Sequence, residues 1–455
     1  MVLRLSSLFN IVFALLLAAG CSSYGVVKNE PKNNTTIAPG SYSYAEMSEF
    51  NVRDSDTTLI LAFSGGGTRA AALSYGVLLE LRDTNINLNG STKRMLDEID
   101  AISSVSGGSF TAAYYGLHGD DAFNDFEQVF LRRDIEGHLI RSLFNPFNWF
   151  KRSGRTETAI KYYEKEIFHG ATFADMQRED GPLIVINASD LAYGVRFSFI
   201  QEYFNLLCSD LSSYPVARAV TASSAVPVLF NPVVVQNYAD CKSHGEPQWL
   251  TDVTERSKDD PQLQMITHGL DSYFIKKDRE YVHFVDGGIT DNLGLRSIYE
   301  AVAVSGGAKA YMDRHKRKIP RRMAIISVNA STDPDPDMDG SNKEPSIVET
   351  IGSVTDVQLH RYNVATHEVM KNALQQWTVE LSTPDREVTS YYIQIEFRNV
   401  KPESLIPFFN AIPTSFSLTD EQNDKLIKAG RDLLRNNPVY QQLVRDLGGT
   451  VVTEP

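Results

Sequence analysis

The feature that most constrains this chain of 455 residues is a unit that occurs twice near its start: an apolar strand, a turn of small residues, and a helix. The two copies span 58–81 and 99–115, and their turns are Ser64–Gly67 and Ser106–Gly108. Strands that alternate with helices in this way predict a sheet with both faces covered. We therefore expect an α/β fold, a three-layer α/β/α sandwich.

Three further apolar runs are typical of buried strands: 183–186, 281–285 and 323–328. Binding sites on such sheets lie at the carboxyl ends of strands, which is where the glycine-rich turns fall. We expect residues 55–330 to form this domain.

After Asn329 the pattern changes to an Asp- and Pro-rich loop, a long helix from near Pro345, a strand over 391–397 and a last helix after Thr419. Gln422, three residues after Thr419, completes a predicted capping box. Residues 331–455 are therefore predicted to be a C-terminal α+β extension packed on the main domain.

The amino terminus has the anatomy of a signal peptide. Arg4 precedes an apolar run from Leu8 to Ala19, which is too short to cross a bilayer and ends in Ala18-Ala19-Gly20-Cys21. This ending resembles a bacterial lipobox, which implies removal of 1–20 and lipidation of Cys21. A plain secretory signal is the alternative. We expect 21–54 to be the lipidated cysteine and a polar tether, and the protein to lie in the bacterial cell envelope. The resemblance to lipoproteins without Asp after the cysteine implies the outer membrane.

The charge and the cysteines exclude several classes of protein. Lys and Arg number 44 against 57 Asp and Glu, so the net charge of −13 argues against a nucleic-acid partner. Three cysteines without a CxxC pair exclude a zinc ribbon, an iron–sulfur protein and a disulfide-dense scaffold. Cys208 and Cys241 form either a disulfide or two buried thiols.

No metal site is predicted. Asp335-x-Asp337-x-Asp339-Gly340 copies the opening of an EF-hand loop, but Ser346 stands at the twelfth position, where calcium needs a bidentate Glu. A solvated acidic loop fits this segment better.

Ser106 is the candidate nucleophile. It is the centre of Ser104-Val105-Ser106-Gly107-Gly108, between a strand and a helix, and this pentad nearly matches the G-x-S-x-G elbow. A sharp turn of that kind exposes the central hydroxyl and needs small neighbours, and Ser104 is small enough to replace the first glycine.

The loop Gly65-Gly66-Gly67-Thr68-Arg69 supplies a candidate oxyanion hole, since amides at a helix N-terminus can converge on negative charge. Arg69 either steadies the loop or binds a phosphate. The same glycines, with Ala70, also fit a dinucleotide fingerprint. That fingerprint needs an acidic residue at the end of the next strand, where this chain has Ser104-Val105-Ser106, so no cofactor is expected.

A third turn, Asp286-Gly287-Gly288, follows the strand 281–285 and offers a base. Together with the glycine loop and the elbow, in this order, it resembles the patatin-like phospholipases. Ala222–Pro227 is similar to a fourth block of that family. The resemblance implies a patatin-like sandwich, a Ser106–Asp286 dyad and an oxyanion hole within Gly65–Arg69, centred on the amides of Gly66 and Gly67. The expected substrate is a phospholipid or another acyl-ester lipid in the membrane that carries the anchor. Ser104 and Ser64 depart from the family pattern without removing a catalytic group.

Two alternatives stay open. A Ser–Asp–His triad could use His315, His360 or His367, all of which follow Asp286, whereas His283 belongs to the strand before it. A non-catalytic envelope lipoprotein with the same fold is the second alternative. The basic run Arg314–Arg322 is either an exposed loop or a contact for anionic lipid headgroups.

Overall fold

The computed structural model describes residues 24–32, 37, 40–46, 56–137, 154–227, 229–239, 248–333, 339–340, 342, 344 and 346–450. Several predicted features lie outside the described residues: the signal peptide, Cys21, Cys241 and the positions Asp335 and Asp337 of the acidic loop. The disulfide and the lipidation therefore stay predictions.

The centre of the fold is a mixed sheet in the order β12-β11-β2-β5-β6-β10-β9, with β7 paired to β6. The five strands from β12 to β6 are parallel, and β10 is antiparallel to both its neighbours. The strands are β1 (Glu30–Pro31), β2 (Thr57–Phe63), β3 (Asn85–Leu88), β4 (Ser91–Arg94), β5 (Ile99–Val105), β6 (Leu183–Asp190), β7 (Arg196–Ser198), β8 (Ser209–Asp210), β9 (Val233–Gln236), β10 (Tyr281–Val285), β11 (Arg322–Asn329) and β12 (Thr389–Glu396).

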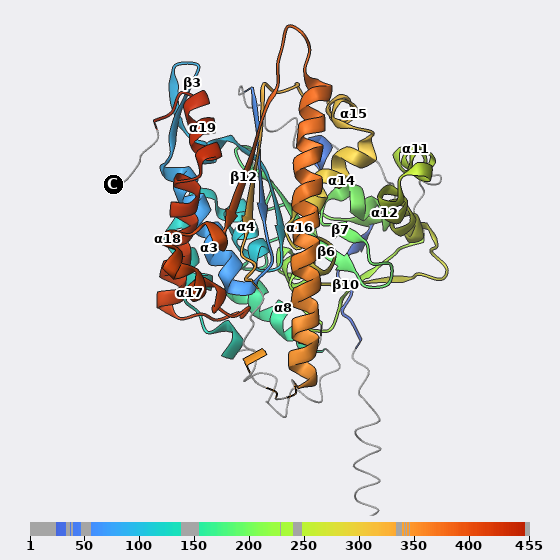
Figure 1. The fold of residues 1–455 in the computed structure, drawn as a ribbon. Helices are drawn as coiled ribbons and strands as arrows, with labels where there is room; N and C mark the ends of the chain where they lie inside the picture. Colours follow the sequence, from blue (N-terminus) through green and yellow to red (C-terminus); the bar gives the residue numbers. More distant parts are fainter. Residues whose placement is uncertain are drawn as a thin grey trace, which may run out of the picture.

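Helices cover both faces of this sheet (Figure 1). They are α3 (Gly67–Asp83), α4 (Gly107–His118), α5 (Ala122–Phe126), α8 (Arg155–Glu166), α9 (Gln201–Leu206), α10 (Val216–Ser223), α11 (Gln248–Arg256), α12 (Pro261–Asp271), α13 (Gly288–Asp291), α14 (Leu295–Ser305), α15 (Ala308–Arg314), α16 (Ile347–Leu381), α17 (Ile406–Asn410), α18 (Asp420–Arg435) and α19 (Pro438–Asp446).

The alternation of side chains along β2 divides the core into two layers. Leu59, Leu61 and Phe63 point into one apolar cluster, which α3, α4 and α18 complete. Ala62, from the opposite face, belongs to a second cluster built with α14, α15 and α16. Successive strand residues face opposite sides of a sheet, so the predicted three-layer α/β/α arrangement is confirmed.

The C-terminal extension is part of the sheet as well as packed on it. β12 is the edge strand and pairs in parallel with β11 along its whole length. α18 begins at the predicted capping box of Thr419 and Gln422 and crosses α3 closely. A Cβ on Gly430 would lie 2.3 Å from the Leu73 carbonyl oxygen, so the two backbones touch there.

The direction of β10 differs from that of the parallel strands. β6 continues three residues past Asn187, the partner of the last residue of β5, and β10 pairs with this extension from the opposite direction. Val285 lies beside Ser189, and the chain then runs back to Asn187, whose carbonyl oxygen lies against Gly287. The turn after β10 therefore reaches the same edge of the sheet as the turn after β5.

Parts of the predicted tether are bound to the domain. β1 pairs with β8. The buried Tyr42 exchanges two hydrogen bonds with the backbone of Ile184 in the central sheet, at 2.8 and 3.1 Å. Residues 24–32 and 40–46 thus do not form a free linker, because strand pairing and hydrogen bonds attach them to the body of the fold. In the part of the chain that the structure describes, no helix has the length and apolar character needed to cross a bilayer.

Candidate active site

Ser106 occupies a sharp turn between β5 and α4. Its φ of 49° and ψ of −122° are strained for a residue with a side chain, as expected of a nucleophile elbow. The glycines after it are required by space: a Cβ on Gly107 would lie 1.9 Å from the Gly67 carbonyl oxygen, and one on Gly108 2.7 Å from the Ser64 carbonyl oxygen. The elbow is therefore packed directly against the glycine-rich loop.

The hydroxyl of Ser106 donates a hydrogen bond of 2.8 Å to Oδ2 of Asp286. The other carboxylate oxygen, Oδ1, accepts the amide of Gly288 at 2.7 Å. Burial raises the pKa of Asp286 to about 6, although both hydrogen bonds favour the charged form. The carboxylate is thus a stronger base than an exposed aspartate and is still ionised at neutral pH.

The last residue of α10, Ser223, and the segment after it join the two turns. Ser223 Oγ accepts the amide of Ser106 at 2.8 Å, and the Ser223 carbonyl accepts the amide of Gly287 at 3.0 Å. The Ala225 carbonyl accepts the amide of Asp286 at 3.0 Å. These residues lie in the fourth block noted in the sequence, but nothing in the pattern indicated that Ser223 would hold the elbow.

The five residues of the predicted oxyanion hole do not have equivalent surroundings. The amide of Gly65 donates to the Asn292 carbonyl at 2.9 Å, and that of Thr68 donates to the Ser415 carbonyl at 2.8 Å. Gly66 and Gly67 stand at the N-terminus of α3, where a helix has no carbonyls for its first amides. Their φ values of 133° and 61° favour glycine. These two amides are therefore the candidates within the loop for binding an oxyanion.

Arg69 steadies the loop. It is buried, and its guanidinium donates to the Ala330 carbonyl at 2.8 Å, to the Thr414 hydroxyl at 3.1 Å and to the Ile412 carbonyl. Burial lowers its pKa to about 10. Of the two roles considered for Arg69, the structure favours support of the loop, because the guanidinium is engaged by the C-terminal segment.

Two asparagines that belong to none of the sequence motifs also line this region. Asn292, whose carbonyl holds Gly65, donates from Nδ2 to Ser331 Oγ at 3.2 Å and to Asn363 Oδ1 at 3.4 Å. Asn363 lies on α16 and donates to the same Ser331 hydroxyl at 2.9 Å. The long helix is thereby tied to the loop that carries the candidate oxyanion hole.

No histidine contacts Asp286 or Ser106 in the described part of the chain. His315 packs between Tyr311 and Tyr44, near the start of β11, whereas the site lies where the parallel strands end. Burial lowers the pKa of His315 to about 4. His367 contacts Tyr392 OH at 2.6 Å and Glu396 at 2.9 Å. His360 is on α16, half-buried, and His283 is exposed on β10.

The basic run Arg314–Arg322 leads from α15 into the first residue of β11. It therefore lies at the amino-terminal ends of the parallel strands, opposite to Ser106 at their carboxyl-terminal ends. Among the described residues, no group of three or more His, Cys, Asp or Glu side chains is arranged to hold a metal ion.

The arrangement can perform acyl transfer: a hydroxyl bonded to a carboxylate of raised pKa, beside two amides at a helix N-terminus. The model of the family described as patatin-like phospholipase matches residues 61–299, which include the glycine loop, the elbow and Asp286. None of the curated proteins matches the chain.

Solved structures similar to this chain include human GIVD cytosolic phospholipase A2, at 10% identity and a TM-score of 0.38, covering 90% of this chain and 65% of that one. The same human protein in complex with methyl gamma-linolenyl fluorophosphonate is 11% identical, with a TM-score of 0.34, covering 90% of this chain and 62% of that one. The chain thus spans slightly less than two thirds of the length of these structures.

Proposed function

Because this chain belongs to the patatin-like phospholipase family, we propose that it is a lipid acyl hydrolase with Ser106 as nucleophile and Asp286 as general base. The observation that carries the proposal is the 2.8 Å hydrogen bond from the Ser106 hydroxyl to a buried carboxylate that no described histidine contacts.

In the first half-reaction, Ser106 Oγ attacks the ester carbonyl carbon and its proton passes to Asp286. The carbonyl oxygen becomes an oxyanion, which accepts hydrogen bonds from the amides of Gly66 and Gly67. The ester C–O bond then breaks, and Asp286 returns the proton to the leaving alcohol. This leaves an acyl group on Ser106.

In the second half-reaction, water attacks the acyl carbon while Asp286 takes one of its protons. Collapse of the oxyanion breaks the bond to Ser106 Oγ, which recovers its proton from Asp286, and the fatty acid leaves. A free aspartate is a poor base for a hydroxyl. The raised pKa of Asp286, about 6, and the oxyanion amides both reduce that mismatch.

We further propose that the protein acts at the cell envelope, held by lipid on Cys21. The lipobox-like ending of the first 21 residues supports this assignment. An anchor raises the effective concentration of the catalyst at its substrate without adding a contact.

Labelling with a fluorophosphonate tests the proposal directly, since such probes react with activated serines. We expect an adduct on the wild-type protein, none on the folded Ser106→Ala variant, and fatty-acid release from phospholipid vesicles only by the wild type. A folded wild-type protein that neither reacts nor releases fatty acid would identify a non-catalytic member with the same fold.

A further inference from the structure

The structure fixes the amino-terminal segment to one side of the domain. Asn29 pairs with the edge strand β9 as a strand would: its Nδ2 donates to the Gln236 carbonyl, and its Oδ1 accepts the Gln236 amide, each at 2.9 Å. Gly25 packs directly against the Val234 side chain, because a Cβ at this position would lie 2.1 Å from Val234 Cγ2. The Val26 carbonyl accepts a hydrogen bond from the Arg218 guanidinium at 3.1 Å. We name residues 24–32 the strap.

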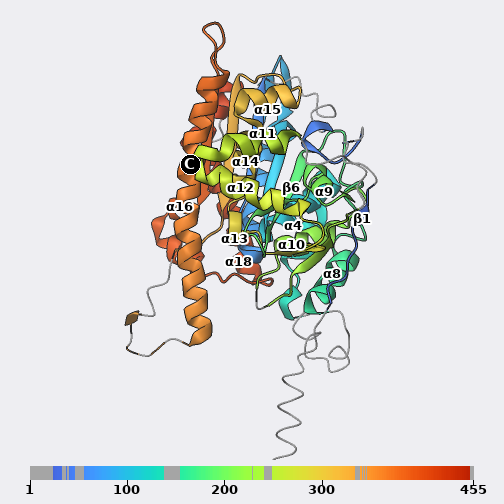
Figure 2. The same cartoon turned by 90° about the vertical axis from the view of Figure 1, so that its right-hand side faces the viewer.

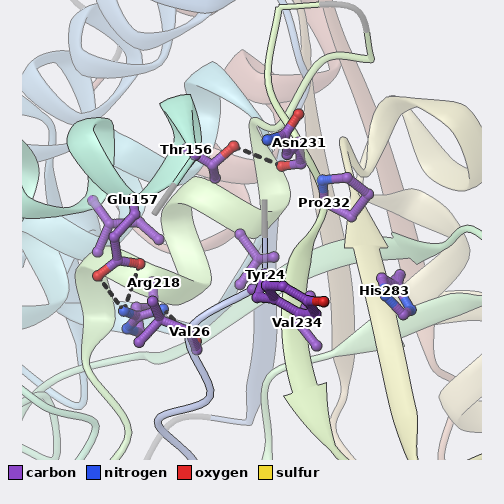
Figure 3. Close-up of a pocket in the computed structure, with 13 residues that line it drawn as sticks. Tyr24, Val26, Thr156, Glu157, Arg218, Asn231, Pro232, Val234 and His283 are labelled. Atoms are coloured by element: carbon purple, nitrogen blue, oxygen red, sulfur yellow. Dashed lines mark hydrogen bonds and ion pairs between the residues drawn. The ribbon is translucent and has the colours of Figure 1, made fainter. Parts of the chain in front are cut away.

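The strap leads toward the active-site edge of the molecule. Tyr24 lines a pocket with Thr156 and Asn231 (Figure 3), and Thr156 donates to the Asn231 carbonyl at 2.7 Å. Asn231 follows Phe230, whose ring centroid is 6.0 Å from that of Phe416. The residue before Phe416 supplies the carbonyl that holds the glycine loop at Thr68. The start of the strap is thus linked to the candidate oxyanion loop through this pocket, one pair of aromatic rings and one backbone hydrogen bond.

The distance from the strap to the predicted anchor is short. Three residue steps separate Cys21 from Tyr24, and a fully extended chain covers at most about 11 Å in three steps. Because the strap is bound to the domain, a lipid on Cys21 holds this side of the domain within that distance of the bilayer surface.

The helix α16 extends past the sheet at the same edge. It begins after β11, at the carboxyl ends of the parallel strands, and its first turns lie beyond the neighbouring elements in both views (Figures 1 and 2). At Asn363 it contacts the glycine-loop network. None of the described side chains of 350–362 is buried, so this part of the helix is not packed in the core.

Four of the exposed apolar side chains lie on elements that reach this edge. Val354 and Val357 on α16 are 57% and 44% exposed, and they lie about 14 and 9 Å along the helix axis from Asn363. Leu229, on the turn that follows Ala225, is 57% exposed, and Ile289, three residues after Asp286, is 53% exposed. Both come from turns that hold the catalytic carboxylate.

We propose that Leu229, Ile289, Val354 and Val357 form a docking face that enters the surface of a lipid bilayer and seats the Ser106 site on it. This proposal rests on the proposed function, and the strap supplies the reason for choosing a bilayer as the occupant. A flexible tether would leave every orientation open. Because the strap is bound to the domain only a few residues from the anchor, it selects the orientation in which the site faces the lipid.

The physical test uses the full-length chain with Ser106→Ala, so its outcome does not depend on catalysis. A nitroxide is attached to Val354→Cys or, as the matched control on the same helix, to Val379→Cys, where the native side chain is 78% exposed; the chain without an added cysteine gives the background. On vesicles of phosphatidylethanolamine and phosphatidylglycerol, the label at 354 should gain collisions with oxygen and lose them with a water-soluble nickel complex. The label at 379 should stay accessible to nickel.

The functional test compares Val354→Asp/Val357→Asp with Val379→Asp. We expect the double variant to lose about tenfold in hydrolysis of vesicle phospholipid, because charge opposes entry into the bilayer, while its hydrolysis of a water-soluble ester stays unchanged. Val379→Asp should alter neither. If the wild-type enzyme hydrolyses neither ester, the proposed function fails. The label experiment still shows whether the docking face contacts the bilayer.

Three results would overturn the docking face. The first is a label at 354 that remains in water on vesicles. The second is protection of that label without vesicles, together with a doubled mass, which would assign the face to a second copy of the chain. The third is a loss of vesicle binding when the charges of Lys316 and Lys318, at the opposite ends of the strands, are reversed, while Val354→Asp/Val357→Asp leaves vesicle binding unchanged.

Discussion

Ser223 Oγ accepts the backbone amide of Ser106 at 2.8 Å. The same hydroxyl donates to the Asn187 carbonyl at 2.6 Å and contacts the Ser109 hydroxyl at 3.0 Å. A single buried oxygen therefore ties the strained elbow to the neighbouring strand β6. Strain of the kind seen at Ser106 persists only where the surroundings hold it, and Ser223 is one of the groups that hold it.

Ser223→Ala should consequently lower kcat about 10- to 100-fold with little change in KM, because a small shift of the nucleophile is costly. The variant should also lose about 1–3 kcal/mol of stability, since the buried amide of Ser106 and the carbonyl of Asn187 each lose a partner. The measurements are ester hydrolysis and thermal unfolding. Ser224→Ala is the matched control: this neighbouring buried hydroxyl bonds to the Val220 carbonyl of its own helix at 2.8 Å. Equal losses of kcat in the two variants would contradict a positioning role for Ser223.

The pH dependence of hydrolysis should reflect the ionisation of Asp286. Only the carboxylate can take the proton of Ser106, and burial places its pKa at about 6. We expect kcat/KM to rise about tenfold per pH unit below that value and to level off above it. Asp291, also buried with a pKa raised to about 6, makes no contact with Ser106. A folded Asp291→Asn variant should therefore show the same fall of kcat/KM below pH 6. If that fall shifted to another pH only in the Asp291 variant, the result would argue against Asp286 as the base.

Asp286→Asn should lower hydrolysis and, at neutral pH, raise the stability of the fold relative to the wild type. An acid whose pKa is about 6 in the folded protein, against an ordinary 3.8, binds its proton more tightly when folded. Its favourable contribution is present below pH 4 and is lost as the pH rises to 6. The amide substitute has no such dependence, so its stability relative to wild type should increase over this range by up to about 3 kcal/mol. Hydrolysis should fall by at least about 100-fold. Chemical denaturation of both proteins at pH 4 and pH 7 measures the difference, and an unchanged difference would disprove the cost of burying this charge.

The sequence predicted the elements that carry the site better than it predicted how they meet. The sequence predicts the strand before Asp286 at 281–285, as observed, but not its antiparallel direction. The side-chain pattern of a strand records which faces are buried and not the direction of its neighbour. Likewise, the alternation over 391–397 indicated a strand, but whether it joins the central sheet depends on β11, far away in the sequence.

Residues that act by hydrogen bonding were the least visible in the sequence. Ser223, Asn292 and Asn363 are ordinary polar residues in their own segments. They gain a role only when the fold brings Ser223 to Ser106, Asn292 to Gly65, and Asn363 to Asn292. Asn29 was assigned to a polar tether for the same reason. A segment that pairs with an edge strand through short polar side chains has the same composition as a linker.

Gly107→Ala should disrupt the site, because the added Cβ would lie 1.9 Å from the Gly67 carbonyl oxygen. Backbone on both sides leaves no flexible side chain to yield, so the elbow and the glycine loop must separate. We expect a loss of at least about 1–3 kcal/mol in stability and loss of fluorophosphonate labelling in the fraction that folds. Gly340→Ala, where nothing lies within 4 Å, is the control and should match the wild type. Normal labelling of a folded Gly107→Ala protein would show that the contact between the two turns is not needed.

The histidines provide the final test of the dyad against a triad. His315→Asn and His360→Asn should keep kcat within about threefold of wild type, a difference of roughly 0.6 kcal/mol in the barrier, because neither side chain reaches Asp286. His367→Asn should lower the unfolding temperature, since the ring lies 2.6 Å from the Tyr392 hydroxyl and 2.9 Å from Glu396, while the folded enzyme stays active. Ester hydrolysis is measured on each purified variant, with Asp286→Asn as the inactive reference. A 100-fold loss of kcat in any one histidine variant that folds normally would replace the dyad with a triad.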